Sequence, residues 1–305
     1  MEGKWSARDM PDQRGRLAVV TGANSGLGYW TARELAQAGA TVVLACRSTT
    51  KGEKAGAEIR LATGADARAA ELDLADLASV RSFAERLGSE RDRVDLLINN
   101  AGVMAPPRRL TKDGFESQFA TNHLGHFALT GLLLAKLLSA PAPRVVTVSS
   151  TMHRRGTIDF TDLQGERSYN RWNAYGQSKL ANLMFCFELQ LRATAAGTPL
   201  LSMAAHPGYA ATNLQSAGPS RFYERAIAAV GNRLVAQSAE MGALPTLYAA
   251  TAPDLPGGSF IGPDGRGEQR GHPRVVTAAG KAYDEDAWRR LWEVSEALTD
   301  VHYEF

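Results

Sequence analysis

A cluster of glycines after the first apolar run constrains the fold more than any other stretch of the chain. The run RLAVVTG (16–22) predicts a buried strand, and TGANSGLG (21–28) follows it directly before a helical pattern that continues to about Ala38. A turn this tight needs backbone angles that glycine adopts without strain. The helix after it offers free N–H groups and the positive end of its dipole, which bind phosphate groups. We therefore expect a strand, a phosphate-binding turn and a helix, although a plain glycine-rich turn is an alternative.

Strands and helices alternate through the first two-thirds of the chain. We expect strands at about 16–22, 41–46, 67–73, 94–100, 143–150 and 199–206, and helices at about 26–38, 51–62, 76–88, 114–139 and 175–195. Several strands are nearly continuous apolar runs, as strands covered on both faces are. Alternating strands and helices imply crossover connections. The predicted fold class is therefore α/β, with a doubly wound parallel sheet of the Rossmann type in a three-layer α/β/α arrangement.

The remaining third has a looser pattern but no evident linker. We expect a helix near 239–252, a short strand around 257–262 that closes the sheet, and a C-terminal helical tail over about 284–305. Residues 209–240 are irregular and helical in turn, and they lie where a lid over a substrate would fall. We therefore expect one domain that spans residues 1–305.

Composition excludes several classes of function. The chain has 34 basic and 32 acidic residues, a net charge of +2, so it has no electrostatic reason to bind nucleic acid or an anionic membrane. The most apolar segment, 127–140, is interrupted by Lys136 and is too short to span a bilayer. The N-terminus has no apolar run typical of a signal peptide. Two cysteines, Cys46 and Cys186, suit a reducing compartment, and we expect a cytoplasmic protein.

The end of the second strand indicates which dinucleotide would bind. An acidic residue there would bind the ribose 2′-hydroxyl and favour NAD. This chain has Arg47 and Ser48 instead, and a guanidinium can grip a 2′-phosphate with two hydrogen bonds. We therefore expect NADP(H) to be favoured over NAD(H), unless Arg47 is only a solvated surface charge. Asp73, at the end of the third strand, could accept from an adenine amino group or serve only as a helix cap or turn residue.

The stretch NAYGQSKLANLMF places Tyr175 and Lys179 on one face of a helix, because residues four apart lie side by side. A nearby ammonium favours the phenolate and would lower the tyrosine pKa, which suits proton transfer. Alternatively, the tyrosine ring simply packs along the lysine stem. The glycine turn and the run VTVSS (146–150) favour a catalytic role for the pair over simple packing. VTVSS ends a strand at the edge where such sheets bind ligands.

Five motifs, TGANSGLG, NNAG, VSS, YGQSK and HPG, occur in the order found in short-chain dehydrogenases/reductases. Over about residues 15–212 the chain resembles the single-domain type of that family, and NHLGHF is similar to the retinol-dehydrogenase-like and protochlorophyllide-reductase-like branch. The resemblance implies four catalytic residues: Asn122, Ser150, Tyr175 and Lys179. Ser150 would hold the substrate oxygen, with Ser149 as the alternative. Asn122 would hold a water that links Lys179 to solvent.

The resemblance also implies a cofactor site. Its predicted residues are Gly22, Asn24, Ser25, Gly26, Leu27, Gly28, Arg47, Ser48, Asp73, Leu74, Asn100, Ala101, Gly102, Tyr175, Lys179, Pro207, Gly208 and Thr212. Pro207 and Gly208 would bend across the nicotinamide, and Thr212 would hold its carboxamide. We expect no metal, because His123 and His126 lie one turn apart without an evident third ligand.

These patterns together predict an NADP(H)-dependent oxidoreductase that moves hydride between the nicotinamide and a carbonyl or alcohol, with Tyr175 as acid or base. Apolar residues in the lid segment suggest an apolar or lipid-like substrate, unless they pack internally. Two alternatives remain: a reductase of carbon–carbon double bonds, and a cofactor-binding sensor without turnover. The resemblance implies a homodimer or homotetramer paired through the helices around Asn122 and Tyr175, although the long tail could block such an interface.

Overall fold

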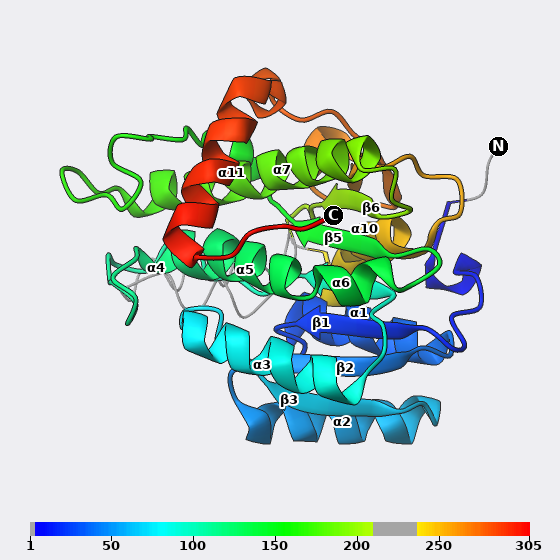
Figure 1. Cartoon of the computed structure of the whole chain (residues 1–305). Helices are drawn as coiled ribbons and strands as arrows, with labels where there is room; N and C mark the ends of the chain where they lie inside the picture. The colour runs from blue at the N-terminus through cyan, green and yellow to red at the C-terminus, as the bar shows by residue number, and fades with distance from the viewer. Residues whose placement is uncertain (1–3, 210–236) are drawn as a thin grey trace, which may run out of the picture.

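The computed structural model describes residues 4–209 and 237–305, and its strands form one eight-stranded sheet in the order β3–β2–β1–β4–β5–β6–β7–β8 (Figure 1). The strands are β1 (Leu17–Thr21), β2 (Thr41–Cys46), β3 (Ala67–Glu71), β4 (Leu96–Asn99), β5 (Arg144–Val148), β6 (Leu201–Ala205), β7 (Phe260–Pro263) and β8 (Pro273–Val275). Neighbours pair in parallel except β8, which runs antiparallel to β7. The predicted doubly wound parallel sheet is thus confirmed.

Helices cover both faces of the sheet (Figure 1). One layer holds α1 (Gly26–Gln37), α2 (Thr49–Thr63) and α10 (Ala239–Thr251); the other holds α3 (Leu77–Glu90), α4 (Ser117–Phe119), α5 (Gly125–Leu132), α6 (Leu134–Leu138) and α7 (Arg171–Ala195), with α11 (Glu285–Thr299) outside it. Short 3-10 turns lie at η1 (Ala7–Asp9), η3 (Thr151–Arg154), η4 (Arg266–Glu268) and η5 (Gly280–Tyr283). None of the described helices combines the length and apolar character that crossing a bilayer requires.

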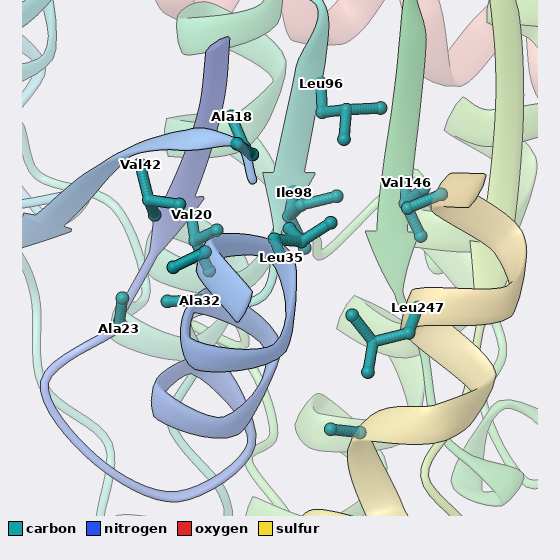
Figure 2. Close-up of a cluster of buried hydrophobic side chains, with 14 of the residues drawn as sticks. Ala18, Val20, Ala23, Ala32, Leu35, Val42, Leu96, Ile98, Val146 and Leu247 are labelled. Carbon is teal, nitrogen blue, oxygen red and sulfur yellow. The ribbon is translucent and has the colours of Figure 1, made fainter. Parts of the chain in front are cut away.

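Strand β1 shows why the predicted strands read as continuous apolar runs. Ala18 and Val20 belong to the cluster that also contains Leu35 of α1 and Leu247 of α10 (Figure 2). Leu17 and Val19 belong to the cluster on the opposite face. Because both faces of the strand are buried, alternation between apolar and polar residues disappears.

The structure differs from the prediction in three elements. The helix expected over 114–139 is interrupted by a π turn, Ala120–Leu124, and again at Leu133. The strand near 260 is not the last strand of the sheet, because β8 pairs antiparallel with it and forms the edge. The sequence pattern did not predict β8. Strand β3 ends at Glu71, so Asp73 lies in the following loop rather than in the strand.

Helix α11 and the tail after it lie across α7 and α5 (Figure 1). Trp292 packs its ring against Phe127, Phe185 and Tyr303, with centroids 5.1, 5.9 and 4.4 Å away. The Tyr303 hydroxyl donates to the Phe127 carbonyl at 2.6 Å. The chain's own C-terminal segment therefore covers part of the helices through which the family resemblance implied pairing.

Replacing Trp292 with alanine should remove the centre of this aromatic cluster. Trp292 is 2% exposed, so we expect a loss of about 3–5 kcal/mol in the free energy of unfolding, as for other buried aromatic truncations. Denaturant unfolding checks this. Trp172, which is 43% exposed on α7, is the matched control, and its alanine variant should stay within about 0.5 kcal/mol of the unchanged protein. Equal effects at the two positions would contradict the packing assigned to α11.

Candidate active site

The predicted glycine turn lies where the sheet order reverses between β1 and β4, the place where doubly wound sheets bind ligands. Gly22 and Gly26 have φ angles of +66° and +58°, which other residues rarely adopt. A Cβ atom on Gly28 would lie 2.5 Å from the side-chain nitrogen of Asn100 and 2.6 Å from the Gly22 carbonyl oxygen. The three glycines are therefore required by the local backbone.

The N-terminus of α1 differs from those of the other long helices. Side chains accept hydrogen bonds from the first backbone N–H groups of α2, α3, α7, α10 and α11; these caps are Ser48, Asp76, Asn170, Ser238 and Asp284. Ser25, the N-cap of α1, makes no such bond. The free N–H groups at the start of α1, beside the glycine turn, fit the pyrophosphate of a dinucleotide.

Two further predicted cofactor residues lie at neighbouring strand ends. Arg47 follows β2 with an exposed side chain, and within residues 4–209 and 237–305 its guanidinium has no hydrogen-bond or ion-pair partner. Ser48 caps α2 by accepting from the Lys51 N–H at 3.4 Å. Asp73 accepts from the Ala75 N–H at 3.0 Å, which is the turn role left open as the alternative. Arg47 is thus placed to meet an added anionic group.

Thr21, at the end of β1, was not among the predicted site residues. Its side chain connects β1 to the loop after β4 and to α5. Its hydroxyl oxygen accepts from the Asn100 and Ala101 N–H groups, both at 2.9 Å. His126 donates through Nδ1 to the Asn122 carbonyl at 3.0 Å, so its Nε2 accepts from the Thr21 hydroxyl at 2.9 Å. Burial lowers the pKa of His126 to about 4 and keeps the ring neutral. The NNAG loop is therefore held at a fixed distance from the glycine turn.

Tyr175 and Ser150 meet at the carboxyl end of β5. Tyr175 is 5% exposed, and the Ser150 side chain lies near enough to its hydroxyl to lower the pKa of the phenol. Ser150 directly precedes the turn η3 as its N-cap, and its side-chain oxygen accepts from the Met152 N–H at 3.2 Å. The Ser149 hydroxyl instead donates to the Lys179 carbonyl at 2.8 Å. The structure thus brings Ser150, rather than Ser149, to the tyrosine.

Lys179 does not act on the tyrosine pKa as the sequence predicted. Its amino group donates to the Val148 carbonyl at 3.0 Å and stands 5.8 Å from the centre of the Tyr175 ring. Burial raises the pKa of Tyr175 to about 12, against the lowering effect of Ser150, and burial lowers the pKa of Lys179 to about 8. In the protein alone, removal from water thus outweighs the expected effect of the ammonium.

Asn122 ties the π turn to the loop after β4. Its amide oxygen accepts from the Val103 N–H at 2.8 Å, and its nitrogen donates to the Val103 carbonyl and the Ser178 hydroxyl at 3.0 and 2.9 Å. A Cβ atom on Gly102 would lie 3.0 Å from that amide oxygen and 3.6 Å from the Lys179 nitrogen. Asn122 therefore positions the Gly102 loop beside Lys179, and its role toward a water stays a prediction.

The predicted turn after β6 is also formed. Gly208 has a φ of +64°, and a Cβ atom there would lie 2.3 Å from the Gln269 carbonyl oxygen. His206 is buried and donates to Glu268 at 3.0 Å, which agrees with its predicted role as a packed strand-end residue. Thr212 and almost all of the lid segment at 209–240 lie outside the described residues. No sequence motif pointed to Glu268, because it lies 62 residues from its partner His206 along the chain.

The histidines expected not to bind metal have protein partners. His123 shares a hydrogen bond of 2.9 Å with Ser295 on α11, and burial lowers its pKa to about 3. Within the two described segments, no three His, Cys, Asp or Glu side chains are grouped so as to hold a metal ion.

A parallel sheet with a glycine turn at its switch point, next to a buried Tyr–Ser–Lys group, defines a dinucleotide-dependent oxidoreductase fold. Comparison with known proteins gives the family: the short chain dehydrogenase model matches residues 16–220. The chain belongs to the short-chain dehydrogenase family, in its retinol-dehydrogenase-like branch.

Three similar proteins illustrate that placement. Human retinol dehydrogenase 13 is 43% identical, over 94% of this chain and 85% of its own. Mouse polyprenol dehydrogenase is 41% identical, over 98% of this chain and 88% of its own. The crystal structure of an uncharacterised protein from Mycobacterium paratuberculosis is 47% identical, covers 99% of this chain and 100% of that chain, and superposes with a TM-score of 0.83.

The buried amine of Lys179 should make stability depend on pH. The folded protein loses this proton near pH 8, and the unfolded chain retains it up to about the usual value of 10.5. Stability should therefore rise between pH 8 and 10, and Lys179→Met should remove this rise and add about 3 kcal/mol at pH 7, from ~1.4 kcal/mol per pKa unit. Unfolding at pH 7 and 10 checks this, with exposed Lys54→Met as control. A variant less stable than the control at pH 7 would contradict it.

Proposed function

We propose that this protein is an NADP(H)-dependent oxidoreductase that interconverts a carbonyl compound and an alcohol. The observation that carries the proposal is the proximity of the Tyr175 and Ser150 side chains, which lie at the carboxyl edge of the sheet beside Lys179. That edge also carries the glycine turn and the uncapped start of α1. Phosphate binding and proton transfer are thus supported at one edge of the same sheet.

Each polar group has a distinct part in this chemistry. The Tyr175 hydroxyl, whose pKa burial raises to about 12, is protonated at neutral pH, so it can donate a proton to a substrate oxygen that gains charge. The Ser150 hydroxyl stabilises the same oxygen by a hydrogen bond. Lys179, held by Val148, supplies positive charge beneath Tyr175. A bound nicotinamide would supply or accept the hydride. In the reverse direction, the deprotonated Tyr175 oxygen, which is the form left after the forward reaction, takes the proton of an alcohol.

Arg47 supports the proposed cofactor, and the similar proteins support the proposed substrate. Arg47 has no described partner and replaces the acidic residue that favours NAD, which supports NADP(H). Retinol dehydrogenase 13 and polyprenol dehydrogenase are named for long apolar alcohols. We extend that chemistry to this chain and propose a lipid-like alcohol or aldehyde as substrate.

Removal of the Tyr175 hydroxyl should abolish most activity. Tyr175→Phe keeps the buried ring but takes away the proton, so we expect kcat to fall at least about 100-fold, the usual size of acid–base catalysis. NADPH oxidation with a panel of apolar aldehydes measures this. Tyr248→Phe on α10 is the matched control, because the Tyr248 ring packs against Trp5 away from the site. Full activity in Tyr175→Phe would disprove the assigned role.

The same panel separates the two alternatives. An enone in the panel shows whether the carbonyl or the carbon–carbon double bond is reduced, because the two products differ. A protein that binds NADPH but reduces no compound in the panel would favour the sensor.

Arg47 should set the preference between the two dinucleotides. Arg47→Leu removes charge-assisted hydrogen bonds of ~1.5–3 kcal/mol, so kcat/KM for NADPH should fall about 10- to 100-fold. The value for NADH should hardly change, since NADH has no 2′-phosphate. Lys54→Met removes a different cation, one on α2, and should alter neither value. A parallel loss with both cofactors would contradict the role of Arg47.

A further inference from the structure

Glu268, in the turn η4 between β7 and β8, joins two segments that flank the candidate reacting centre. One carboxylate oxygen accepts from Arg154 at 3.0 Å, and the other accepts from the ring of His206 at 3.0 Å. Arg154 ends the turn η3 that begins after Ser150. His206 directly precedes Pro207 and Gly208. A single side chain therefore bridges the serine turn and the turn after β6.

The hydrogen bonds around His206 require an acceptor at this position. The Gly208 N–H donates to His206 Nδ1 at 3.2 Å, so the proton of the neutral ring is on Nε2, which faces Glu268. Arg154 also only donates. A carboxylate can accept from both partners, whereas an amide would point its N–H₂ group at one of the two donors. Glutamate is thus the group that satisfies both sides.

The serine turn is tied to the same C-terminal segment by a second histidine. His153 donates through Nδ1 to the Ser150 carbonyl at 2.7 Å, and its Nε2 accepts from the Ala279 N–H at 3.1 Å. Arg154 also donates to the Thr277 carbonyl at 3.2 Å. The ring of Phe260 packs against both histidines, with centroids 5.5 Å from His153 and 5.2 Å from His206. Rotation of either ring is thereby restricted.

The backbone of this turn keeps Glu268 in place at a conformational cost. Glu268 has a φ of +58°, a left-handed angle that residues with a side chain rarely adopt. The next residue, Gln269, accepts from the Tyr209 N–H at 2.7 Å and fits against Gly208. An unfavourable backbone angle that is maintained by these contacts, next to a site, suggests a role for the side chain in that site.

We propose that Glu268 is a positioning residue: through Arg154 and His206 it keeps Ser150 and the Pro207–Gly208 turn in register. The proposal rests on the proposed function, in which Ser150 meets the substrate oxygen and the turn borders the nicotinamide. Glu268 itself touches neither. Loss of the bridge should let the two halves of the site shift relative to each other, which slows the hydride step more than it weakens binding.

The test uses Glu268→Gln, which keeps size and removes one acceptor. With NADPH and the aldehyde that the unchanged protein reduces fastest, we expect kcat to fall about 10- to 100-fold while both KM values change less than about 3-fold. With NADPH deuterated at C4, the isotope effect on kcat should rise, because hydride transfer becomes slower than product release. A loss of folded protein alone would not raise that isotope effect. Asp264→Asn, which neutralises another carboxylate of the same segment, should leave both readouts unchanged.

A second variant tests the bridge if Glu268→Gln fails to fold. Arg154→Met breaks one arm of the bridge at a half-exposed side chain, and the same fall in kcat and rise in isotope effect are expected. When both changes are combined, Arg154→Met should add little, because the two residues act through one contact. Unchanged kcat and isotope effect in Glu268→Gln, or in Arg154→Met where the former does not fold, would overturn the proposal. An unchanged protein without turnover on the whole panel would instead refute the proposed function.

Discussion

Burial of both faces of the parallel sheet is the constraint on which the rest of the structure depends. Helices cover β2, β1, β4, β5 and β6 on both sides, whereas the edge strand β3 keeps exposed residues. Along the central strands, water therefore reaches the backbone only beyond the strand ends. Polar residues that follow a strand are therefore gathered at its carboxyl edge. Gly22, Asn100, Ser150 and His206 all come directly or nearly directly after a strand. The assembly of the candidate site follows from the fold, because four distant segments end at one edge.

The same burial changes the chemistry of the groups that point inward from this edge. It raises the pKa of Tyr175 and lowers that of Lys179, so each group resists the charged state. A positive nicotinamide placed over this pair would act against the first effect, whereas the protein alone does not. The sequence argument about Tyr175 and Lys179 considered their attraction and omitted desolvation, which dominates at these positions. Spacing along a helix predicts proximity but gives no measure of burial.

How much could be predicted from sequence differs between local and distant features. The positions of the strands along the chain up to β6, the glycine turn and the helix that carries Tyr175 follow from local patterns of glycine and apolar residues. The choice between Ser149 and Ser150 could not be made from VTVSS, because both hydroxyls follow the same strand. Asn122 was predicted, but apolar periodicity shows neither the π turn that carries it nor its bonds to Val103. Glu268 lies 62 residues from its partner His206, so no local signal exists.

The C-terminal helix has a consequence for how the site is supported. Trp292 and Tyr303 take up the apolar surface of α5 and α7, the two helices that carry or flank Tyr175 and the π turn. This aromatic packing on α5 and α7 is thus formed within one chain. A second copy that approaches these helices would consequently meet the chain's own tail at this place and not the bare surface of α5 and α7.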